Sequence, residues 1–391
     1  MTNQPIETDP RAHSSRREEV EIGVALGALG FLLAGLGACV AVLARDLDLP
    51  AERLALLPSA FAVGLLVVAV VGPVVLRTFT ISVVLRVGSI VCALGGVLIA
   101  IAPQYVVAIG GGLCVGLGGA LLILIAPLLL SGPTAAVRLT KVNAFASATG
   151  ILAPLAIGAV DALGATGRLA MLAAAPPLLA LAVFARPAAT HQQAASGGLV
   201  VLQVARGWLR VVLAVAVEFC FVVWAVARLV TTGLPMATAA LLGSAFPIGM
   251  AVGRAIGPLR LRDWSPLVPA GVLAMGGTLL VSLFDGPAVV TVGLVIAGIG
   301  IAPLYPMTVA ALVATPGLSP ARLAALGAAA SGAAILSAPA ILAGLTRVVD
   351  LRTAFLITLP LLAILFAISR PLRPLSVRTS PGDHAAPRAL R

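Results

Sequence analysis

One carboxylate of this chain lies where ionisable groups are rare. Of the 14 Asp and Glu residues, Glu218 is the only one well inside an apolar stretch long enough to cross a bilayer. It lies about 12 Å from Arg210, at the polar end of that stretch, at 1.5 Å per helical residue. Because a charge at that depth is costly, we expect Glu218 to exchange a proton or to bind a cationic group. A structural hydrogen bond to a neighbouring helix is the alternative.

Three other residues are candidate contacts for a bound molecule. Phe221 follows Glu218 at a spacing of three, which places both on roughly one helix face. Tyr305 lies between two prolines of a later apolar stretch, and a broken helix at membrane depth is typical of a cavity wall. A plain kinked packing helix is the alternative for that segment. Asn143 begins a small polar set that continues with Ser147 in an earlier stretch.

Prolines mark the positions at which a helix is expected to bend or break. They are Pro154, Pro303, Pro306 and Pro339. The three histidines and four cysteines form no nucleophile–His–acid arrangement and match no metal-binding spacing. A phosphate-cradling Gly-Lys-Ser/Thr loop is also absent from the sequence. We therefore expect no enzyme activity, no metal site and no cofactor.

The elements that carry these residues must be membrane-spanning helices. The chain of 391 residues is 60% hydrophobic and only 10% charged, whereas a soluble globular protein carries about 25% charged residues. Strict alternation with period two is absent, so helices are favoured over a membrane barrel. The apolar stretches predict twelve spans, at 22–44, 54–76, 81–102, 106–130, 142–163, 168–186, 208–230, 236–258, 265–284, 288–314, 322–345 and 352–370.

Positive charge indicates the orientation of these spans. Six of the 25 Lys and Arg residues lie at the predicted outer ends, and the other 19 lie on the side of the two termini. This bias places both termini in the cytoplasm. The net charge of +11 is therefore a topology signal and gives no reason to expect nucleic-acid binding. The expected parts are a cytoplasmic tail (1–20), a six-helix bundle (21–187), a cytoplasmic loop (188–207), a second six-helix bundle (208–370) and a cytoplasmic tail (371–391).

The sequence repeats itself half a chain apart. Residues 49–77 and 234–262 align without a gap at a shift of 185, with 14 of 29 positions identical. Residues 168–187 and 352–371 align at a shift of 184, with eight of 20 positions identical. Because each half holds an even number of spans, the two halves have the same orientation in the membrane. Such parallel repeats hold a substrate site between them near the midplane.

Both copies of the repeat carry Gly-Pro-x-x-Leu-Arg at a short loop. The first copy holds Gly72 and Arg77, and the second holds Gly257 and Arg262. With six plus six spans and cytoplasmic termini, the chain resembles transporters of the major facilitator superfamily, which usually carry Gly-x-x-x-Asp-Arg-x-Gly-Arg-Arg at this loop. A leucine, Leu76 in the first copy, replaces the acid of that motif. The resemblance implies an all-α membrane fold and alternating access between two bundles.

The resemblance also assigns places to single residues. In that family the first, fourth, seventh and tenth spans line the central cavity, which would bring Glu218 and Tyr305 together. Arg254 lies near the end of the predicted eighth span, where the first half has Ala69. We expect its side chain to snorkel to the cytoplasmic interface. A gating ion pair is the alternative reading of Arg254, but the acid that the family motif supplies as a partner is missing.

The predicted function is secondary active transport across the cytoplasmic (inner) membrane. The expected partners are a small organic substrate, protons as the coupling ion and the lipid bilayer, and the expected state is a monomer. A partial Gly-Pro motif at 150–158 resembles that of the family's antiporters and favours efflux. Import or facilitated diffusion of a sugar or organic acid is the alternative within transport. A non-transporting sensor or a membrane protein acting on lipid is the alternative from another class.

Overall fold

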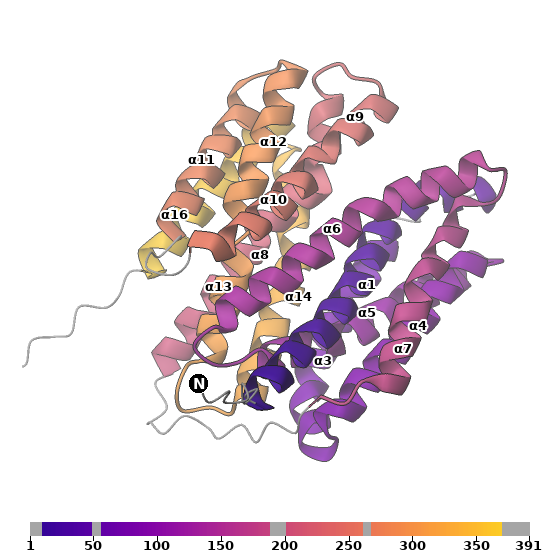
Figure 1. The fold of residues 1–391 in the computed structure, drawn as a ribbon. Coiled ribbons are helices and arrows are strands. Elements are labelled where there is room, and N and C mark those ends of the chain that lie inside the picture. The colour runs from indigo at the N-terminus through magenta and orange to yellow at the C-terminus, as the bar shows by residue number, and fades with distance from the viewer. Residues whose placement is uncertain (1–9, 49–55, 188–200, 261–266, 370–391) are drawn as a thin grey trace, which may run out of the picture.

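The computed structural model describes residues 10–48, 56–187, 201–260 and 267–369, and all regular structure in these ranges is helical. The first half holds α1 (Pro10–Asp46), α3 (Leu56–Thr78), α4 (Ile81–Ile101), α5 (Tyr105–Leu129), α6 (Ala135–Ala162), η1 (Gly167–Ala174) and α7 (Ala175–Phe184). The second half holds α8 (Val201–Val230), α9 (Met236–Gly243), α10 (Ala245–Arg260), α11 (Leu267–Leu283), α12 (Pro287–Ile301), α13 (Leu304–Val313), α14 (Pro320–Leu345), α15 (Leu351–Ala354), η2 (Phe355–Ile357) and α16 (Thr358–Ser369). Figure 1 shows these elements in chain order.

The helices have the length and composition of membrane spans. Within the described ranges, 10 helical segments are long and apolar enough to cross a bilayer. Two shorter apolar helices, Leu241–Ile256 and Leu267–Leu283, take the places of the predicted eighth and ninth spans. The prediction of an all-α, multi-pass membrane protein is therefore confirmed.

Two helices begin earlier than the predicted spans. α1 begins at Pro10, inside the predicted tail (1–20), and α8 begins at Val201, inside the predicted loop (188–207). The additional turns contain polar residues, which explains the difference. Hydropathy marks only the part of a helix that crosses the hydrocarbon layer, whereas backbone hydrogen bonding continues into the polar layer beyond it.

The two halves are built from the same helix pairs. α1 packs on α6 as α8 packs on α14, and α4 packs on α5 as α11 packs on α12. α3 packs on α5 as α10 packs on α12. In both halves, therefore, the first span contacts the fifth, the third contacts the fourth and the second contacts the fourth. This equivalence confirms the two parallel six-helix bundles that the internal repeat predicts.

Glycines at equivalent positions allow the close approach of the second and fourth spans in each half. A Cβ atom on Gly64 of α3 would lie 2.2 Å from the carbonyl carbon of Gly116 in α5. A Cβ on Gly249 of α10, which is 185 residues later, would lie 2.3 Å from the carbonyl oxygen of Val295 in α12. Small residues at such contacts let helix backbones meet in lipid, where van der Waals packing drives association.

Arginines at equivalent positions fasten the last span of each half to the third. Arg168, at the start of the sixth span, donates to the carbonyl of Ala102 after α4 at 2.5 Å and pairs with Asp46 at 3.1 Å. Arg352, at the start of the twelfth span, pairs with Asp285 after α11 at 2.5 Å. The two arginines occupy matching positions of the repeat, so these contacts belong to the duplicated fold.

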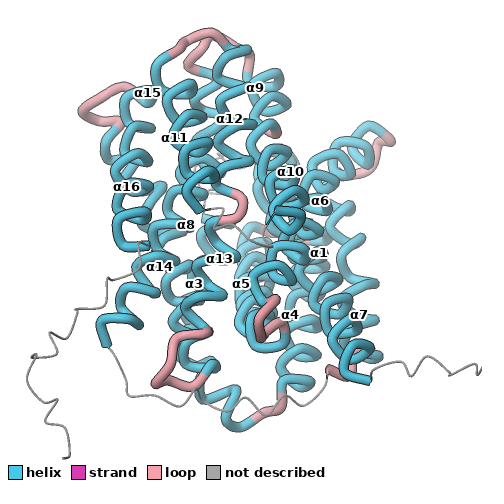
Figure 2. Tube along the Cα trace, turned by 60° about the vertical axis from the view of Figure 1, so that its left-hand side comes forward, coloured by secondary structure: helices cyan, strands magenta, loops and turns pink. Residues whose placement is uncertain are grey.

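The halves meet through two equivalent helix pairs. α3 packs against α14, and α6 packs against α10, so that the second span of each half contacts the fifth span of the other. α13 adds contacts to α5 and α6. In Figures 1 and 2 the halves lie close together at the end that carries the N terminus and spread apart towards the other end.

Candidate functional site

Glu218 and Arg254 form an ion pair inside the second half. Arg254 Nη2 lies 3.1 Å from Glu218 Oε1, and the two side chains are only 10% and 16% exposed. Glu218 lies in α8 and Arg254 in α10. The expectation that Arg254 snorkels to the interface is therefore wrong. An arginine that can bind a buried carboxylate gains more by neutralising it than by extending to water, because an unpaired charge in that place is costly.

Arg254 also contacts the other half of the molecule. Its Nη1 donates to the hydroxyl of Ser147, which lies in α6 of the first half. α6 and α10 are one of the two equivalent helix pairs that join the halves. One guanidinium thus binds a carboxylate on its own half and a hydroxyl on the opposite half. The guanidinium therefore connects the carboxylate to the contact between the two halves.

The break in the tenth span supplies the third partner of Arg254. α12 ends at Ile301 and α13 begins at Leu304. In a continuous helix the carbonyl of Ala302 would accept from the N–H four residues later, but that residue is Pro306, which has none. Arg254 Nε donates to this carbonyl at 3.4 Å. The proline therefore frees an acceptor that helps to hold the arginine beside Glu218.

Tyr305 belongs to the same cluster. It follows the break in the tenth span and is half-buried. Its hydroxyl lies near enough to Ser331 of α14, Glu218 and Arg254 to interact with them electrostatically. The structure thus brings together Glu218 and Tyr305, as the family resemblance implies, and adds Arg254 and Ser147 to them. All four residues lie where the seventh, eighth, tenth and fifth spans approach one another.

Two candidate contacts lie elsewhere or are already engaged. Phe221 is fully buried in the core of the second half, where its ring stacks on Phe246 and tilts against Phe355 at centroid distances of 5.2 Å. Asn143 donates its side-chain amide to the carbonyl of Leu139 one turn earlier, at 2.8 Å. Phe221 therefore packs the bundle, and the amide hydrogen of Asn143 serves its own helix.

The first copy of the loop motif lies in α3 of the first half, whereas the ion pair joins α8 to α10 of the second half. Gly72 is buried, and a Cβ there would lie 2.8 Å from Leu124 of α5, so this glycine serves helix packing. Arg77 is exposed in the last turn of α3. Gly257 lies in α10, and Arg262 lies outside the described residues.

Of the four prolines expected to disturb a helix, only those in the tenth span accompany a break. Pro303 precedes α13, and Pro306 lies in its first turn. Pro154 and Pro339 lie inside the continuous helices α6 and α14. The carbonyl of Pro339 accepts a hydrogen bond from the indole nitrogen of Trp224 at 3.2 Å, which links α14 to α8.

Sequence reasoning missed the partnership of Glu218 with Arg254, although a signal was available. Both charges are absent from the first half, which has Leu33 and Ala69 at the matching positions. Two opposite charges that one copy of a repeat gains inside neighbouring spans are expected to pair, since neither is stable there alone. The asymmetry of the repeat could therefore have identified the pair.

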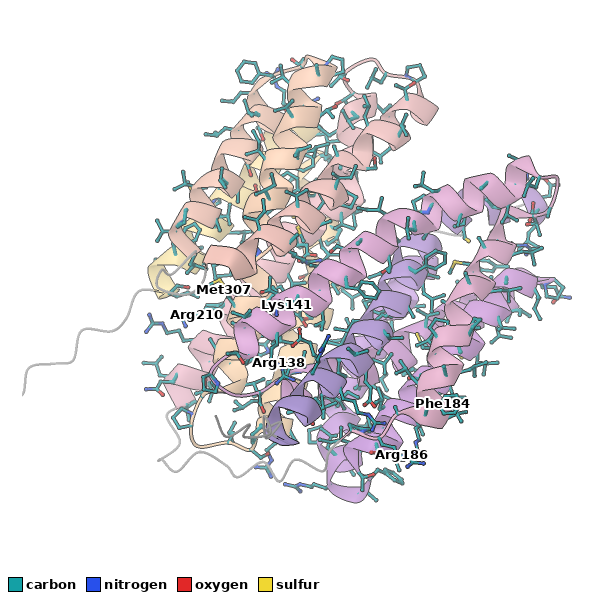
Figure 3. All side chains as sticks on the ribbon, viewed as in Figure 1. Arg138, Lys141, Phe184, Arg186, Arg210 and Met307 are labelled. Carbon is teal, nitrogen blue, oxygen red and sulfur yellow. The ribbon has the colours of Figure 1, made fainter. Side chains whose placement is uncertain are left out.

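A second group of charges lies at the N-terminal end of α1 and involves the first half alone. Arg138 lies 3.8 Å from Glu18 and 3.5 Å from Glu19, and Lys141 lies 3.7 Å from Glu19. Figure 3 shows Arg138 and Lys141 near the lower end of α6. These contacts fasten α1 to α6 and do not reach the second half. Among the described residues, no group of three or more His, Cys, Asp and Glu side chains is placed to hold a metal ion.

Comparison with known proteins identifies the fold. No protein-family model and no curated protein sequence matches the chain. Solved structures match over nearly the whole chain. The fucose:proton symporter FucP of E. coli has a TM-score of 0.68 and 18% identity, with 90% of this chain and 98% of that chain covered. The human organic anion transporter MFSD10 has a TM-score of 0.70 and 17% identity, with 92% and 100% covered. The proton:xylose symporter XylE has a TM-score of 0.67 and 14% identity, with 90% and 94% covered.

Proposed function

We propose that this chain, which has the fold of major facilitator superfamily transporters, is a proton-coupled secondary transporter of a small organic molecule. The observation that supports this function is the Arg254 guanidinium, which binds Glu218 at 3.1 Å on its own half and Ser147 on the opposite half. In a protein whose two bundles rock against each other, this contact links a titratable group to the interface that must open and close.

The proposed coupling step is a proton transfer to Glu218. When the carboxylate takes up a proton, it loses its charge and its attraction for Arg254. The arginine then lacks its countercharge in a weakly polar site, which favours a rearrangement that exposes it to water or to an anionic group of a substrate. Because the same guanidinium donates to Ser147, that rearrangement also removes a bond between the halves. Release of the proton restores the pair.

The proposed orientation follows from the distribution of positive charge, which places both termini in the cytoplasm. In that orientation the end at which the halves spread apart in Figure 1 faces outward, and the end that carries the N terminus faces the cytoplasm. We expect a partly apolar substrate, because the predicted spans contain few charged or amide side chains besides the Glu218–Arg254 pair. Efflux remains the proposed direction, on the strength of the partial Gly-Pro motif around Pro154. The symporters named above make proton-coupled uptake the second candidate.

The first experiment is a thermal-shift screen of small molecules against the purified full-length protein, its Glu218→Gln variant and an Asp350→Asn control, at pH 6 and pH 8. A ligand that binds the folded state raises the apparent melting temperature by mass action. We expect at least one compound whose stabilisation of the wild type depends on pH and whose pH dependence is lost in Glu218→Gln alone.

The compounds found in this way are then tested in liposomes that contain a pH-sensitive dye. Addition of a substrate should change the internal pH with the wild type and leave it constant with Glu218→Gln. If both proteins transport the compound and neither moves protons, the protein is a facilitator and the proposed proton coupling is wrong. If compounds bind but none is transported, the result contradicts the transporter function and favours a membrane sensor.

A further inference from the structure

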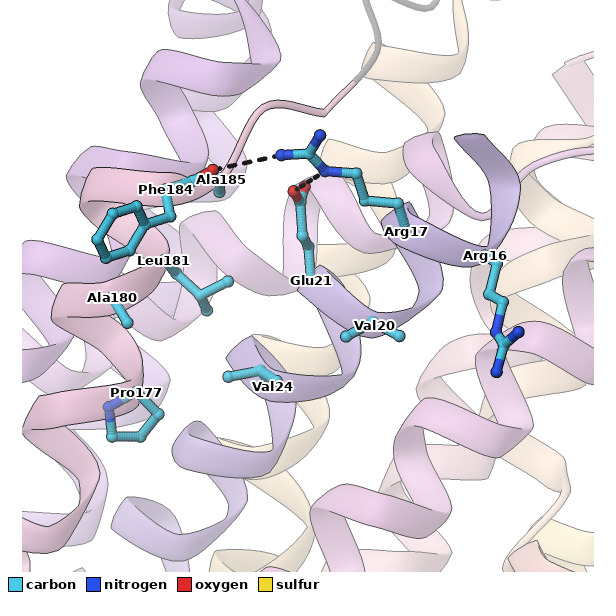
Figure 4. A pocket seen from close by; sticks show the side chains of 10 residues that line it. All are labelled: Arg16, Arg17, Val20, Glu21, Val24, Pro177, Ala180, Leu181, Phe184 and Ala185. Carbon is cyan, nitrogen blue, oxygen red and sulfur yellow. Dashed lines mark hydrogen bonds and ion pairs between the residues drawn. The ribbon is translucent and has the colours of Figure 1, made fainter. Parts of the chain in front are cut away.

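A groove of about 690 Å³ lies between α1 and α7 of the first half (Figure 4), whereas the Glu218–Arg254 pair lies in the second half. It opens at the end of the first half that carries the N terminus. In Figure 3, Phe184 at one edge of this groove and the neighbouring Arg186 lie at that same end. In a bilayer crossed by these helices, a groove at their end would lie near the boundary between the hydrocarbon and headgroup layers of one leaflet.

The walls of the groove are apolar and open to the surroundings. They are formed by Val20, Val24, Pro177, Leu181 and Phe184. Val20 is 58% exposed and Phe184 is 73% exposed. From Pro177 to Phe184 the wall extends over seven residues, or roughly 10 Å of helix. A surface of this shape accommodates a stretch of hydrocarbon chain.

The mouth of the groove is cationic. Arg16 and Arg17 line it, and both are exposed; in Figure 4 the guanidinium of Arg17 lies at the mouth beside Glu21, whereas Arg16 extends from the opposite side of α1 and would turn towards a ligand. Arg17 is held in place, because its Nε donates to Glu21 at 2.9 Å and its Nη2 donates to the Phe184 carbonyl at 3.3 Å, as Figure 4 shows. Its side chain is nevertheless 52% exposed, so the guanidinium retains donors that face away from the protein. Arg16 makes no ion pair with any described residue.

Two further arginines adjoin the groove, and its one carboxylate, Glu21, accepts hydrogen bonds through Oε1, whereas its Oε2 is buried without a hydrogen-bond partner among the described residues. Arg86 donates from Nη2 to the carbonyl of Ala185, a lining residue, at 3.3 Å. The backbone N–H of Arg186 donates to Glu21 Oε1 at 3.2 Å, and this same oxygen accepts from Arg17. The groove thus combines an excess of positive charge at its mouth with an apolar wall beneath it.

We propose that this groove binds an acidic phospholipid. Its phosphate would accept hydrogen bonds from Arg16 and Arg17, since guanidinium groups match phosphate oxygens in shape and charge. One acyl chain would lie along Val24, Pro177 and Leu181. A basic pocket between transmembrane helices is a known form of lipid-headgroup site. The proposal uses the orientation given above only to name the leaflet, which is the cytoplasmic one, and is independent of proton coupling.

Native mass spectrometry of the full-length protein in detergent, titrated with dioleoyl phosphatidylglycerol or dioleoyl phosphatidylcholine, tests this site. We expect the wild type to retain phosphatidylglycerol in preference to phosphatidylcholine. The variant Arg16→Gln/Arg17→Gln should bind phosphatidylglycerol about 30-fold more weakly, at roughly fivefold for each basic residue near an anionic headgroup. The matched control is Arg77→Gln/Arg322→Gln, which removes two exposed arginines on the same proposed side of the membrane and should change binding less than twofold.

A second variant separates the acyl chain from the phosphate. Ala180 lines the groove and is exposed, so Ala180→Trp fills the groove while every charge is kept. It should weaken phosphatidylglycerol binding, and soluble glycerol 3-phosphate should not displace the lipid from the wild type. Equal binding of both lipids, full binding by Arg16→Gln/Arg17→Gln, or displacement by glycerol 3-phosphate at the lipid's own concentration would each overturn the proposal, the last in favour of a site for soluble anions.

Discussion

Removing both members of the Glu218–Arg254 pair is expected to destabilise the protein by less than the sum of the two single losses. Two unit charges 3.1 Å apart attract each other by roughly 5 kcal/mol at an effective dielectric constant of about 20. Glu218→Gln leaves the buried guanidinium without a countercharge, which costs about 3 to 5 kcal/mol. Arg254→Gln is expected to cost about 1 to 3 kcal/mol, because the carboxyl group that remains can take up a proton and become neutral.

The double variant Glu218→Gln/Arg254→Gln leaves no charge in the site. It should lose about 2 kcal/mol less than the sum of the two single losses, which is the range of coupling energies for residues in contact. The measurement is equilibrium unfolding in mixed micelles of dodecylmaltoside and sodium dodecyl sulfate, followed by tryptophan fluorescence at pH 7. Each variant needs a matched gel-filtration profile, so that the comparison concerns folded proteins of the same size.

Strict additivity of the two single losses would refute this reasoning. It would mean that the charges do not interact in the folded protein, and that Arg254 is stabilised through Ser147 and Ala302 alone. A variant Arg254→Lys serves as the charge control. It keeps the positive charge but lacks the planar fork that reaches three acceptors at once, so it should retain part of the coupling with Glu218 and lose the contact with Ser147.

Three other perturbations follow from the structure. Ser147→Ala removes the bond from Arg254 to the first half, and spin-label distances between the halves should broaden while the Glu218–Arg254 coupling persists. Gly64→Ala places a Cβ 2.2 Å from the backbone of Gly116 and should cost about 1 to 3 kcal/mol of unfolding free energy, whereas Gly110→Ala, which meets nothing within 4 Å, should be nearly neutral. Asp350 caps α15 by accepting from the Thr353 N–H at 3.1 Å, and the Thr353 side chain, followed by this N–H, holds the pKa of the Asp350 carboxyl below its usual value. Its stabilising effect is present above the unfolded-state pKa of about 3.9 and is lost as pH falls through the lower folded-state pKa, so Asp350→Ala should lower the melting temperature at pH 7 and match the wild type in strong acid.

Most of the fold could be predicted from the sequence because a bilayer leaves few solutions. Twelve apolar stretches must form helices, since their backbone groups have no water to bond to. The repeat of residues 49–77 at 234–262 predicts two equivalent bundles, and the recurring helix pairs confirm them. The least certain parts were the starts of α1 and α8, because polar first turns carry no hydropathy signal.

The candidate site was only partly predictable, for a related reason. Glu218 could be recognised from its own sequence context, since a carboxylate in a membrane span is conspicuous in isolation. Helical spacing could not show whether Phe221 contacts a substrate or packs in the core. It lies on roughly the same helix face as Glu218, yet its ring packs against Phe246 and Phe355. The position of Arg254 near the end of a span could not show where its side chain points. A guanidinium there is stabilised either by extending to water or by pairing with a carboxylate.

The sequence by itself determined the membrane environment, the helical class, the duplication and the one acidic residue at depth. These properties depend on composition and on local periodicity, because the partition of each stretch between water and lipid is decided by its own side chains. Only the tertiary structure decided that Arg254 of α10 meets Glu218 of α8, Ser147 of α6 and the carbonyl of Ala302 at the broken tenth span. These partners lie 36 to 107 residues away along the chain, and the packing of helices across the two halves is what brings them within bonding distance.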